Sequence, residues 1–457
     1  MLIQQFHLLM NEGWRGIFAQ QRTLERAIEH AIALPCVLGR RTISRSISAL
    51  GRSEVDWSAD YKMYSRSNWE RTERLYDPVI DEYLNRYRNE PVVAALDDTK
   101  LKKTGRKIKG AQWYRDPLSP PFHMNLAYGL RFLQASILFP HYKEGDYPPR
   151  GIPVRFEQAP TIKKPGKRAS DEARELYQQL KKTKNLSAQA LELIKSLRES
   201  IDSRGGKDRD LLFVGDGTFC NRTMFKASLD RTHIIARCRK DARLCFAAPE
   251  SSRRKYDEHL FTPEEVRKRD ANWSWANVYM GGKRRRVRYK EVKEVLWKRG
   301  AGTKPLRLIV IAPVPYKLSK KSKTNYRQPA YFLSTDLNSP TGLLIRACFD
   351  RWQIEVNHRD EKDLLGVGQA QVTNENSIPR HPALAVAAYS LLLLAALQSF
   401  GPGRTEHYHT RPKWSRDSKR PSLLDIVTLL RSDCSEASVS PLLPKNFAKN
   451  LWRYANT

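Results

Sequence analysis

The chain has 457 residues and a mass of 52.8 kDa, more than one compact core usually holds, so we expect more than one domain. Lys and Arg total 81 against 49 Asp and Glu, which leaves a formal net charge of +32 at pH 7. Such an excess is typical of proteins that bind polyanions and argues against a small-molecule enzyme, while 40% hydrophobic and 10% aromatic residues exclude a disordered basic tail.

Residues 1–88 carry apolar side chains at helical spacing in two segments separated by Pro35. The second segment presents arginines beside hydroxyl side chains, a combination suited to phosphates and base edges. It contains Arg40, Arg41, Thr42, Ser44, Arg45 and Ser46. We therefore predict a helical DNA-binding domain resembling a helix-turn-helix, although an ordinary helical bundle with a basic face fits the same pattern.

Two apolar segments end in aspartate and read as buried strands. Residues 91–98 (PVVAALDD) end in Asp97 and Asp98, and residues 210–217 (DLLFVGDG) contain Asp216 near their end. Because successive strand side chains point to opposite faces, only one of Asp97 and Asp98 can face a shared site. The intervening chain is predicted to contain an extended region, a Lys/Pro/Gly-rich linker over 141–168, and helices over 170–182 and 187–203.

Basic residues gather in two stretches. Residues 99–115 hold seven Lys or Arg, including Lys102 and Lys103, and no acidic residue. Residues 283–307 hold eleven, including Arg284, Arg285 and Arg286, inside a β-like block with predicted strands IIAR, RLCFAA, RLIVIAP and AYFLSTD. We expect these cations to contact DNA phosphates, with Trp273, Trp275 and Trp297 as candidates for base stacking; core packing is the alternative for each tryptophan.

A predicted helix over residues 341–365 contains Arg351, Glu355 and Lys362, which lie four and seven residues apart and so share one face. Three carboxylates that converge from two strands and a helix can hold two Mg²⁺ ions against a phosphodiester. The simpler alternative is a solvated helix with intrahelical ion pairs. The two strand-end aspartates and the net charge favour the metal site.

These motifs, in this order, resemble the DDE transposases of bacterial insertion sequences, in the subgroup with a Tyr-x2-Arg-x3-Glu-x6-Lys signature. Arg351, Glu355 and Lys362 match the last three positions, whereas Cys348 stands where the tyrosine belongs, so a role for a tyrosine hydroxyl is in doubt. LDDTKLKKTG is similar to the family's first catalytic strand and FVGDGTF to its second. The resemblance covers roughly residues 90–400.

The resemblance implies an α/β fold with a ribonuclease-H-like catalytic core interrupted by a β-rich insertion. The expected parts are a helical DNA-binding domain at 1–88, the first part of the core at 89–231, the insertion at 232–338, the last part of the core at 339–400, and a DNA-binding or dimerisation region at 401–457. The implied catalytic and metal-binding residues are Asp98, Asp216 and Glu355, with Asp97 as the alternative first carboxylate. The implied cofactor is a pair of Mg²⁺ ions, which Mn²⁺ can replace.

The expected function is therefore transposition: binding of terminal inverted repeats in double-stranded DNA, cleavage at the element ends, and transfer of the 3′-hydroxyl strand to target DNA. We expect a homodimer or a higher synaptic assembly. Three alternatives stay open, namely a catalytically inactive transposase-derived DNA-binding protein, a ribonuclease-H-like repair nuclease, and a basic RNA-binding protein.

The expected location is the cytoplasm of a prokaryote, at the nucleoid. Six cysteines without a CxxC pair and an N-terminus without a signal-peptide pattern favour this reading. The apolar stretch 382–400 is nearly long enough to span a bilayer, but Ser390 and Gln398 interrupt it. We predict a buried helix there and no membrane partner.

Overall fold

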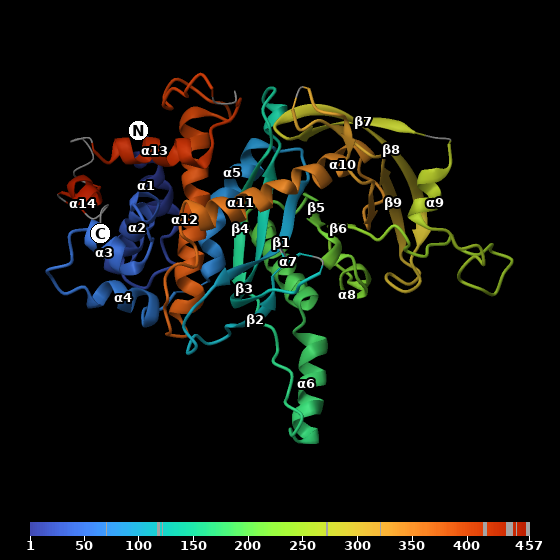
Figure 1. Cartoon of the computed structure of the whole chain (residues 1–457), viewed down its shortest axis with the longest axis horizontal. Helices are drawn as coiled ribbons and strands as arrows, with labels where there is room; N and C mark the ends of the chain where they lie inside the picture. Colours follow the sequence, from blue (N-terminus) through green and yellow to red (C-terminus); the bar gives the residue numbers. More distant parts are fainter. Residues whose placement is uncertain are drawn as a thin grey trace.

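A mixed ten-stranded sheet runs through the protein, and helices lie on both of its faces (Figure 1). The computed structural model describes residues 1–69, 71–116, 119–120, 122–270, 273–319, 321–414, 418–435, 442–444 and 446–453. The predicted α/β class is confirmed.

The strands of the large sheet are β1 (Val92–Lys102), β2 (Gln112–Arg115), β3 (Leu126–Phe139), β4 (Arg150–Gln158), β5 (Leu211–Gly215), β6 (Thr232–Arg237), β7 (Ser274–Met280), β8 (Lys283–Leu296), β9 (Pro305–Ile311) and β12 (Ala330–Ser334). A separate two-stranded ribbon contains β10 (Pro315–Tyr316) and β11 (Asn325–Tyr326). In the large sheet the order is β4-β3-β1-β5-β6-β12-β9-β8-β7, with β2 also paired to β3. β3 is antiparallel to β1 and β4, whereas β5 and β6 run parallel to β1.

The helices in chain order are α1 (Leu2–Gly13), α2 (Gln21–Cys36), α3 (Ile43–Ala49), α4 (Ser58–Ser65), η1 (Thr72–Tyr76), α5 (Asp77–Arg86), η2 (His141–Lys143), α6 (Asp171–Thr183), α7 (Leu186–Ser203), η3 (Gly217–Phe219), α8 (Arg222–Lys226), α9 (Pro263–Lys268), α10 (Thr341–Asp350), α11 (Trp352–Asp363), α12 (Ser377–Phe400), α13 (Leu423–Asp433) and α14 (Phe447–Arg453).

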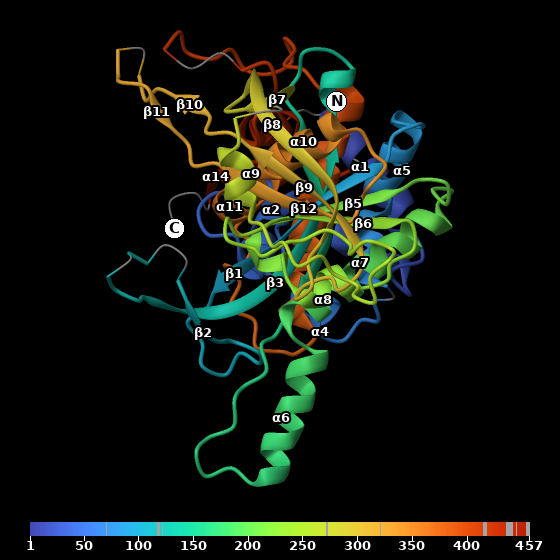
Figure 2. The same cartoon turned by 90° about the vertical axis from the view of Figure 1, so that its right-hand side faces the viewer.

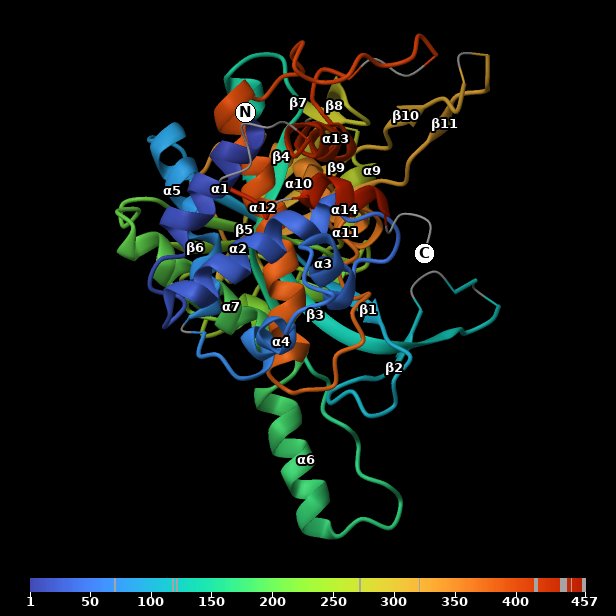
Figure 3. The ribbon, with the colours of Figure 1, turned by 90° about the vertical axis from the view of Figure 1, so that its left-hand side faces the viewer.

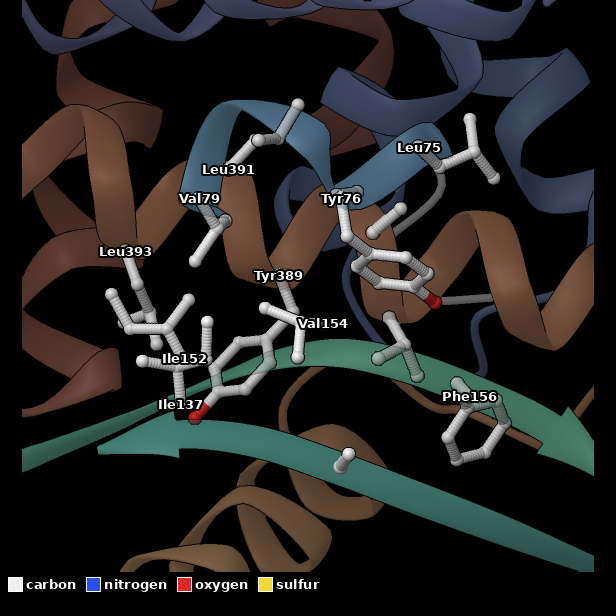
Figure 4. Close-up of a cluster of buried hydrophobic side chains, with 14 of the residues drawn as sticks. Leu75, Tyr76, Val79, Ile137, Ile152, Val154, Phe156, Tyr389, Leu391 and Leu393 are labelled. Carbon is white, nitrogen blue, oxygen red and sulfur yellow. The ribbon is translucent and has the colours of Figure 1, made fainter. Parts of the chain in front are cut away.

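α12 is the central core helix of the protein. It lies against β4 and η1, and its Tyr389 and Leu393 pack near Ile152 and Val154 of β4 (Figure 4). By length and composition α12 could cross a membrane, but 83% of its most apolar window is buried inside the protein. The prediction of a buried helix is therefore confirmed, because the apolar side chains of this segment pack in the core. The helix begins at Ser377, five residues before Pro382.

The N-terminal and C-terminal helices pack together against α12 (Figure 3). The backbone N–H of Ile3 donates to Asp433 Oδ2, and the Cys36 and Cys434 sulfurs lie 3.8 Å apart. One hydrophobic cluster runs from α1 through α12 to β4, so the N-terminal helices share their core with the rest of the chain. α2 extends through Pro35 and ends at Cys36, so the predicted break comes one residue later.

The opposite face of the sheet is covered by α10 and α11. α10 packs on β7 within a second apolar cluster, and α11 packs on β1, β3 and β4. The predicted single helix over 341–365 is thus two helices that meet at Arg351, whose backbone is itself helical.

The prediction of a strand at RLCFAA was wrong: residues 243–248 are all described, and they form isolated bridges, such as Cys245 with Leu296, instead of a strand.

Candidate functional site

Two aspartates lie side by side where the parallel strands β1 and β5 end their pairing. Leu96 of β1 is paired with Gly215 of β5, so Asp97 and Asp216 occupy the next register position. Asp216 has an extended backbone and accepts hydrogen bonds from the Thr218 backbone N–H at 2.8 Å and from the Thr218 hydroxyl at 3.2 Å. Neighbouring strands are about 4.8 Å apart, so these two carboxylates are close neighbours.

A third carboxylate reaches the same region from α11. Ile354 of α11 packs on Ala95 of β1, and Asp97 is two residues beyond Ala95, on the same face of the strand. Arg351 joins the helix to the strand: its Nη2 donates to Glu355 Oε1 at 2.7 Å and its Nη1 to Asp97 Oδ2 at 3.4 Å. Asp97 and Glu355 therefore flank one guanidinium, and the strand register places Asp216 beside Asp97.

Burial and neighbouring carboxylates disfavour the ionised form of Asp97 in this cluster. Burial raises the pKa of Asp97 to about 7, with further contributions from the neighbouring carboxylates of Asp216 and Asp98, although Arg351 opposes the shift. Burial also lowers the pKa of Lys362, which lies one helical turn beyond His358 on the same helix. A partly buried acidic cluster of this kind attracts cations.

Asp98 points to the other face of β1. It shares that face with Lys100, and Lys100 is paired with Arg131 of β3. Burial raises the pKa of Asp98; Arg131 and Lys100 oppose that shift, the Asp216 carboxylate adds to it, and Lys362 opposes it. The backbone N–H of Asp98 donates to Asp97 Oδ1 at 2.8 Å, which helps to fix the Asp97 side chain. The sequence resemblance led us to expect Asp98 as the first carboxylate, whereas the contact with Arg351 favours Asp97.

The donor set has the chemistry that Mg²⁺ prefers, namely carboxylate oxygens with no soft ligand among them. The side chains are nevertheless not arranged as a complete set of ligands. The described residues contain no group of three or more His, Cys, Asp or Glu side chains positioned to hold one ion. The position between Asp97 and Glu355 is taken by the Arg351 guanidinium. The residues thus fit a divalent cation by type, and Arg351 must move for Asp97 and Glu355 to share one.

The residues expected to bind phosphates differ in their exposure and in their distance from the carboxylates. Lys102 is exposed at the end of β1 and lies near Lys362. Lys103 is only 5% exposed, and its ammonium donates to the carbonyl oxygens of Gly368 and Ala370, so it is held in the interior. Arg284, Arg285 and Arg286 are exposed on β8, five strands away from β1, or roughly 24 Å at the usual strand spacing.

The three tryptophans proposed for base stacking also differ. Trp275 is 54% exposed, with the Arg286 guanidinium 4.9 Å from its ring. Trp273 is half-buried beneath Lys290 and Arg288. Trp297 packs edge-on against Phe225, as expected of a core residue.

Sequence reasoning missed Trp113 on β2, which is 53% exposed and nearer the carboxylates. Its ring and that of Tyr128 both lie against the guanidinium of Arg106, at 5.2 and 5.1 Å. The available signal was a tryptophan in the middle of the basic stretch that follows the first aspartates. This cationic and aromatic surface is carried by strands that extend from the carboxylate cluster.

Comparison with known proteins adds no family to this description. No known protein family matches the chain, and no curated protein is significantly similar to it.

Proposed function

We propose that this chain is a DNA transposase of the DDE type, with Asp97, Asp216 and Glu355 as its catalytic carboxylates. The observation that carries the proposal is the register of β1 and β5, which makes Asp97 and Asp216 neighbours on the face covered by the Glu355 helix. Asp98, which the family pattern favours, remains the alternative first carboxylate.

The order and direction of five strands support a ribonuclease-H-like core. β4, β3 and β1 form an antiparallel meander, and β5 and β6 continue the sheet in parallel with β1. The carboxyl ends of parallel strands, and the helix that crosses them, are where α/β sheets commonly carry their sites. The strands β7, β8 and β9, inserted before the Glu355 helix, correspond to the expected β-rich insertion.

Mg²⁺ held by the three carboxylates would supply Lewis-acid stabilisation and an activated water for phosphodiester hydrolysis. Arg351 and Lys362 would turn from the carboxylates toward the incoming phosphate and neutralise its charge. Lys102 and the Arg106–Trp113 surface would hold the adjacent DNA. The same residues would then align the freed 3′-hydroxyl with target DNA, because phosphoryl transfer depends mainly on position and charge.

The proposed partners are double-stranded terminal inverted repeats and target DNA, handled by two or more copies of the chain at the nucleoid of a prokaryotic cell. The direct test is cleavage of a DNA fragment that carries the repeats flanking the gene, in Mg²⁺ and again in Mn²⁺. Cleavage at the repeat ends that is lost in Glu355→Gln supports the proposal. Cleavage that ignores the repeat sequence points to a ribonuclease-H-like repair nuclease, and cleavage by Glu355→Gln removes Glu355 from the site.

A second candidate is a transposase-derived DNA-binding protein without catalysis. It is favoured by the Arg351 bridge, whose positive charge offsets part of the charge of Asp97 and Glu355 without any metal. This candidate predicts repeat-specific binding that is unchanged by EDTA and no heat of Mn²⁺ binding in calorimetry. Measurable Mn²⁺ binding that Glu355→Gln weakens would instead support the catalytic proposal.

A further inference from the structure

A cavity of about 290 Å³ lies between α11, the start of β4 and the start of α13. Its wall on α11 includes Gln353, Asn357, Asp360 and Leu364. These positions recur at helical spacing on the side of α11 opposite Glu355. The cavity is therefore separate from the carboxylate cluster, although the same helix contributes to both.

Two arginines line this cavity and hold its two sides together. Arg150, at the start of β4, donates from Nη2 to the carbonyl oxygen of Pro421. In return, Arg420 donates to the carbonyl oxygen of Pro149 and, at 3.1 Å, to Gln353 Oε1. These contacts fix the segment before α13 against β4 and α11, and they place both guanidinium groups at the cavity.

The positive charges of these two arginines lack an ionic partner. Arg150 is only 8% exposed, and within the part of the chain that the structure describes neither Arg150 nor Arg420 forms an ion pair. Asp360 also lines the cavity, but its Oδ1 accepts hydrogen bonds from Arg359. Burial lowers the pKa of Arg420 well below its ordinary value, and the charge of Arg150 adds to this shift. Because a buried cation without a counterion is costly, an anion in the cavity would stabilise both arginines.

The other charges near the cavity do not supply that anion. The charged side chains that line it are three arginines and two aspartates, with a formal net charge of +1: Arg150, Arg359, Arg420, Asp360 and Asp363. Asp425 of α13 lies within electrostatic range of Arg150, but it is already paired with Arg404 and Arg411. The surroundings therefore favour an anionic ligand.

We propose that this cavity binds a small phosphate dianion, either inorganic phosphate or a phosphate monoester, between the guanidinium groups of Arg150 and Arg420. Phosphate oxygens match the planar fork of a guanidinium. The volume is at the lower end for small-molecule sites. The exposed Asp363 and Leu424 on the wall disfavour the backbone of a DNA duplex. The bound anion would tie the start of α13 to α11, and the proposal does not depend on catalysis.

The test is calorimetric titration of the full chain with inorganic phosphate in about 0.3 M sodium chloride, which screens exposed cations. We expect one site per chain with a Kd below about 1 mM. Leu424→Asp places a negative charge at the wall from a position that is 53% exposed, and it should weaken binding at least about tenfold. Leu424→Asn has nearly the same shape without the charge and should bind normally. Arg420→Gln should bind as weakly as Leu424→Asp.

Two further measurements locate the site and identify the source of the phosphate. Phosphate should slow hydrogen exchange in residues 419–424, and Arg239→Gln, which removes an exposed cation elsewhere, should leave binding unchanged. Tighter binding of glycerol 3-phosphate than of inorganic phosphate would assign the site to a monoester. Equal phosphate affinity in Leu424→Asp and the unchanged chain overturns the proposal. So does displacement of phosphate by duplex DNA together with weaker DNA binding by Leu424→Asp, which would assign the cavity to a backbone phosphate.

Discussion

Arg351 Nη2 lies 2.7 Å from Glu355 Oε1, and Nη1 of the same guanidinium lies 3.4 Å from Asp97 Oδ2. A cation of the protein itself thus stands between two carboxylates that we propose as metal ligands. The side chains of Arg351 and Asp97 are less than one-fifth exposed, and that of Glu355 is about one-third exposed. Solvent therefore screens the interactions among these three charges only partly. Arg351 and a divalent cation therefore compete for the same carboxylates.

Replacing Arg351 by glutamine should raise the affinity of the DNA-free protein for Mn²⁺ by about tenfold, because the competing positive charge is removed. DNA cleavage should fall at the same time, because the phosphate loses a contact. Calorimetry with Mn²⁺ measures the first effect independently of activity. Arg359→Gln, on an exposed part of α11, is the matched control and should leave Mn²⁺ affinity as it is. Equal Mn²⁺ affinity in Arg351→Gln and the unchanged chain would contradict the competition.

The two adjacent aspartates of β1 can be told apart by matched asparagine variants. Asp97→Asn should lower the cleavage rate by about a thousandfold, since it removes a carboxylate from the face shared with Asp216 and Glu355. Asp98→Asn should retain activity within about tenfold, because Asp98 faces Lys100 and Arg131. Single-turnover cleavage at saturating DNA compares the chemical step directly. The reverse ranking would restore Asp98 as the first ligand.

Asp350, at the end of α10, should make stability depend on pH. Burial raises its pKa to about 8, and Oδ1 has no hydrogen-bond partner among the described residues. The folded protein therefore keeps this proton up to about pH 8, whereas the unfolded chain loses it near pH 4. Stability from this group is present below about pH 4 and is lost as the pH rises toward 8.

Asp350→Asn should consequently stabilise the protein at pH 8 by about 1–3 kcal/mol and have little effect near pH 4. Urea denaturation at several pH values measures the difference between variant and unchanged chain. Asp171→Asn, at an exposed position of α6, provides the control. A stability gain for Asp350→Asn that is the same at pH 4 and pH 8 would rule out this ionisation as its cause.

Asp60 should be essential for the N-terminal helices. It is 1% exposed and lies 2.9 Å from His30 Nε2, 2.9 Å from Arg52 Nη1 and 3.4 Å from Arg26 Nε. Burial alone would raise the pKa of Asp60, but these partners lower it below its ordinary value. Its contribution is therefore present above about pH 4 and is lost as the pH falls below that value.

Asp60→Ala should cost about 3–5 kcal/mol at pH 7, because it leaves the buried His30 and the partly buried Arg26 and Arg52 without their carboxylate. The difference from the unchanged chain should shrink in acid. Denaturant unfolding at pH 7 and at pH 3.5 checks both statements, with exposed Glu54→Gln as the control. A loss below about 1 kcal/mol at pH 7 would mean that water replaces the carboxylate.

The elements of the site could be predicted from local patterns, but their mutual arrangement could not. The apolar runs before Asp97 and Asp216 predicted β1 and β5, and the predicted helices over 170–182 and 187–203 correspond to α6 and α7. The run VVAAL before the aspartates has no polar alternation, so nothing in it shows which aspartate faces α11. That choice depends on the pairing of Leu96 with Gly215 and on the packing of Ile354, which are both long-range contacts.

The same limit explains the other differences. RLCFAA has the composition of a strand, but its neighbours offer only isolated bridges, and strand formation depends on those neighbours. Lys103 belongs to a basic stretch, and only the fold shows that carbonyl oxygens of Gly368 and Ala370 enclose its ammonium. The sequence predicted a helix over 170–182, but not that α6 would stand outside the body with none of its side chains buried (Figure 2).

Trp113 and Trp297 should respond differently to alanine substitution. Trp113→Ala should weaken DNA binding by about tenfold or more, because stacking of a base on an exposed aromatic ring contributes about 1–3 kcal/mol. Trp297→Ala should instead lower stability by about 3–5 kcal/mol through loss of its packing against Phe225. Fluorescence anisotropy with end-containing DNA and denaturant unfolding give the two readouts.

The salt dependence of binding supplies the control for that pair. For the unchanged chain, the logarithm of the binding constant should fall linearly with the logarithm of salt concentration, by about 0.9 for each neutralised phosphate of duplex DNA. Lys102→Gln should reduce this slope by about 0.9, whereas Trp113→Ala should lower affinity at every salt concentration with the slope unchanged. A reduced slope in Trp113→Ala would show that Trp113 acts by holding the Arg106 guanidinium against a phosphate, because the ring and that cation are in contact.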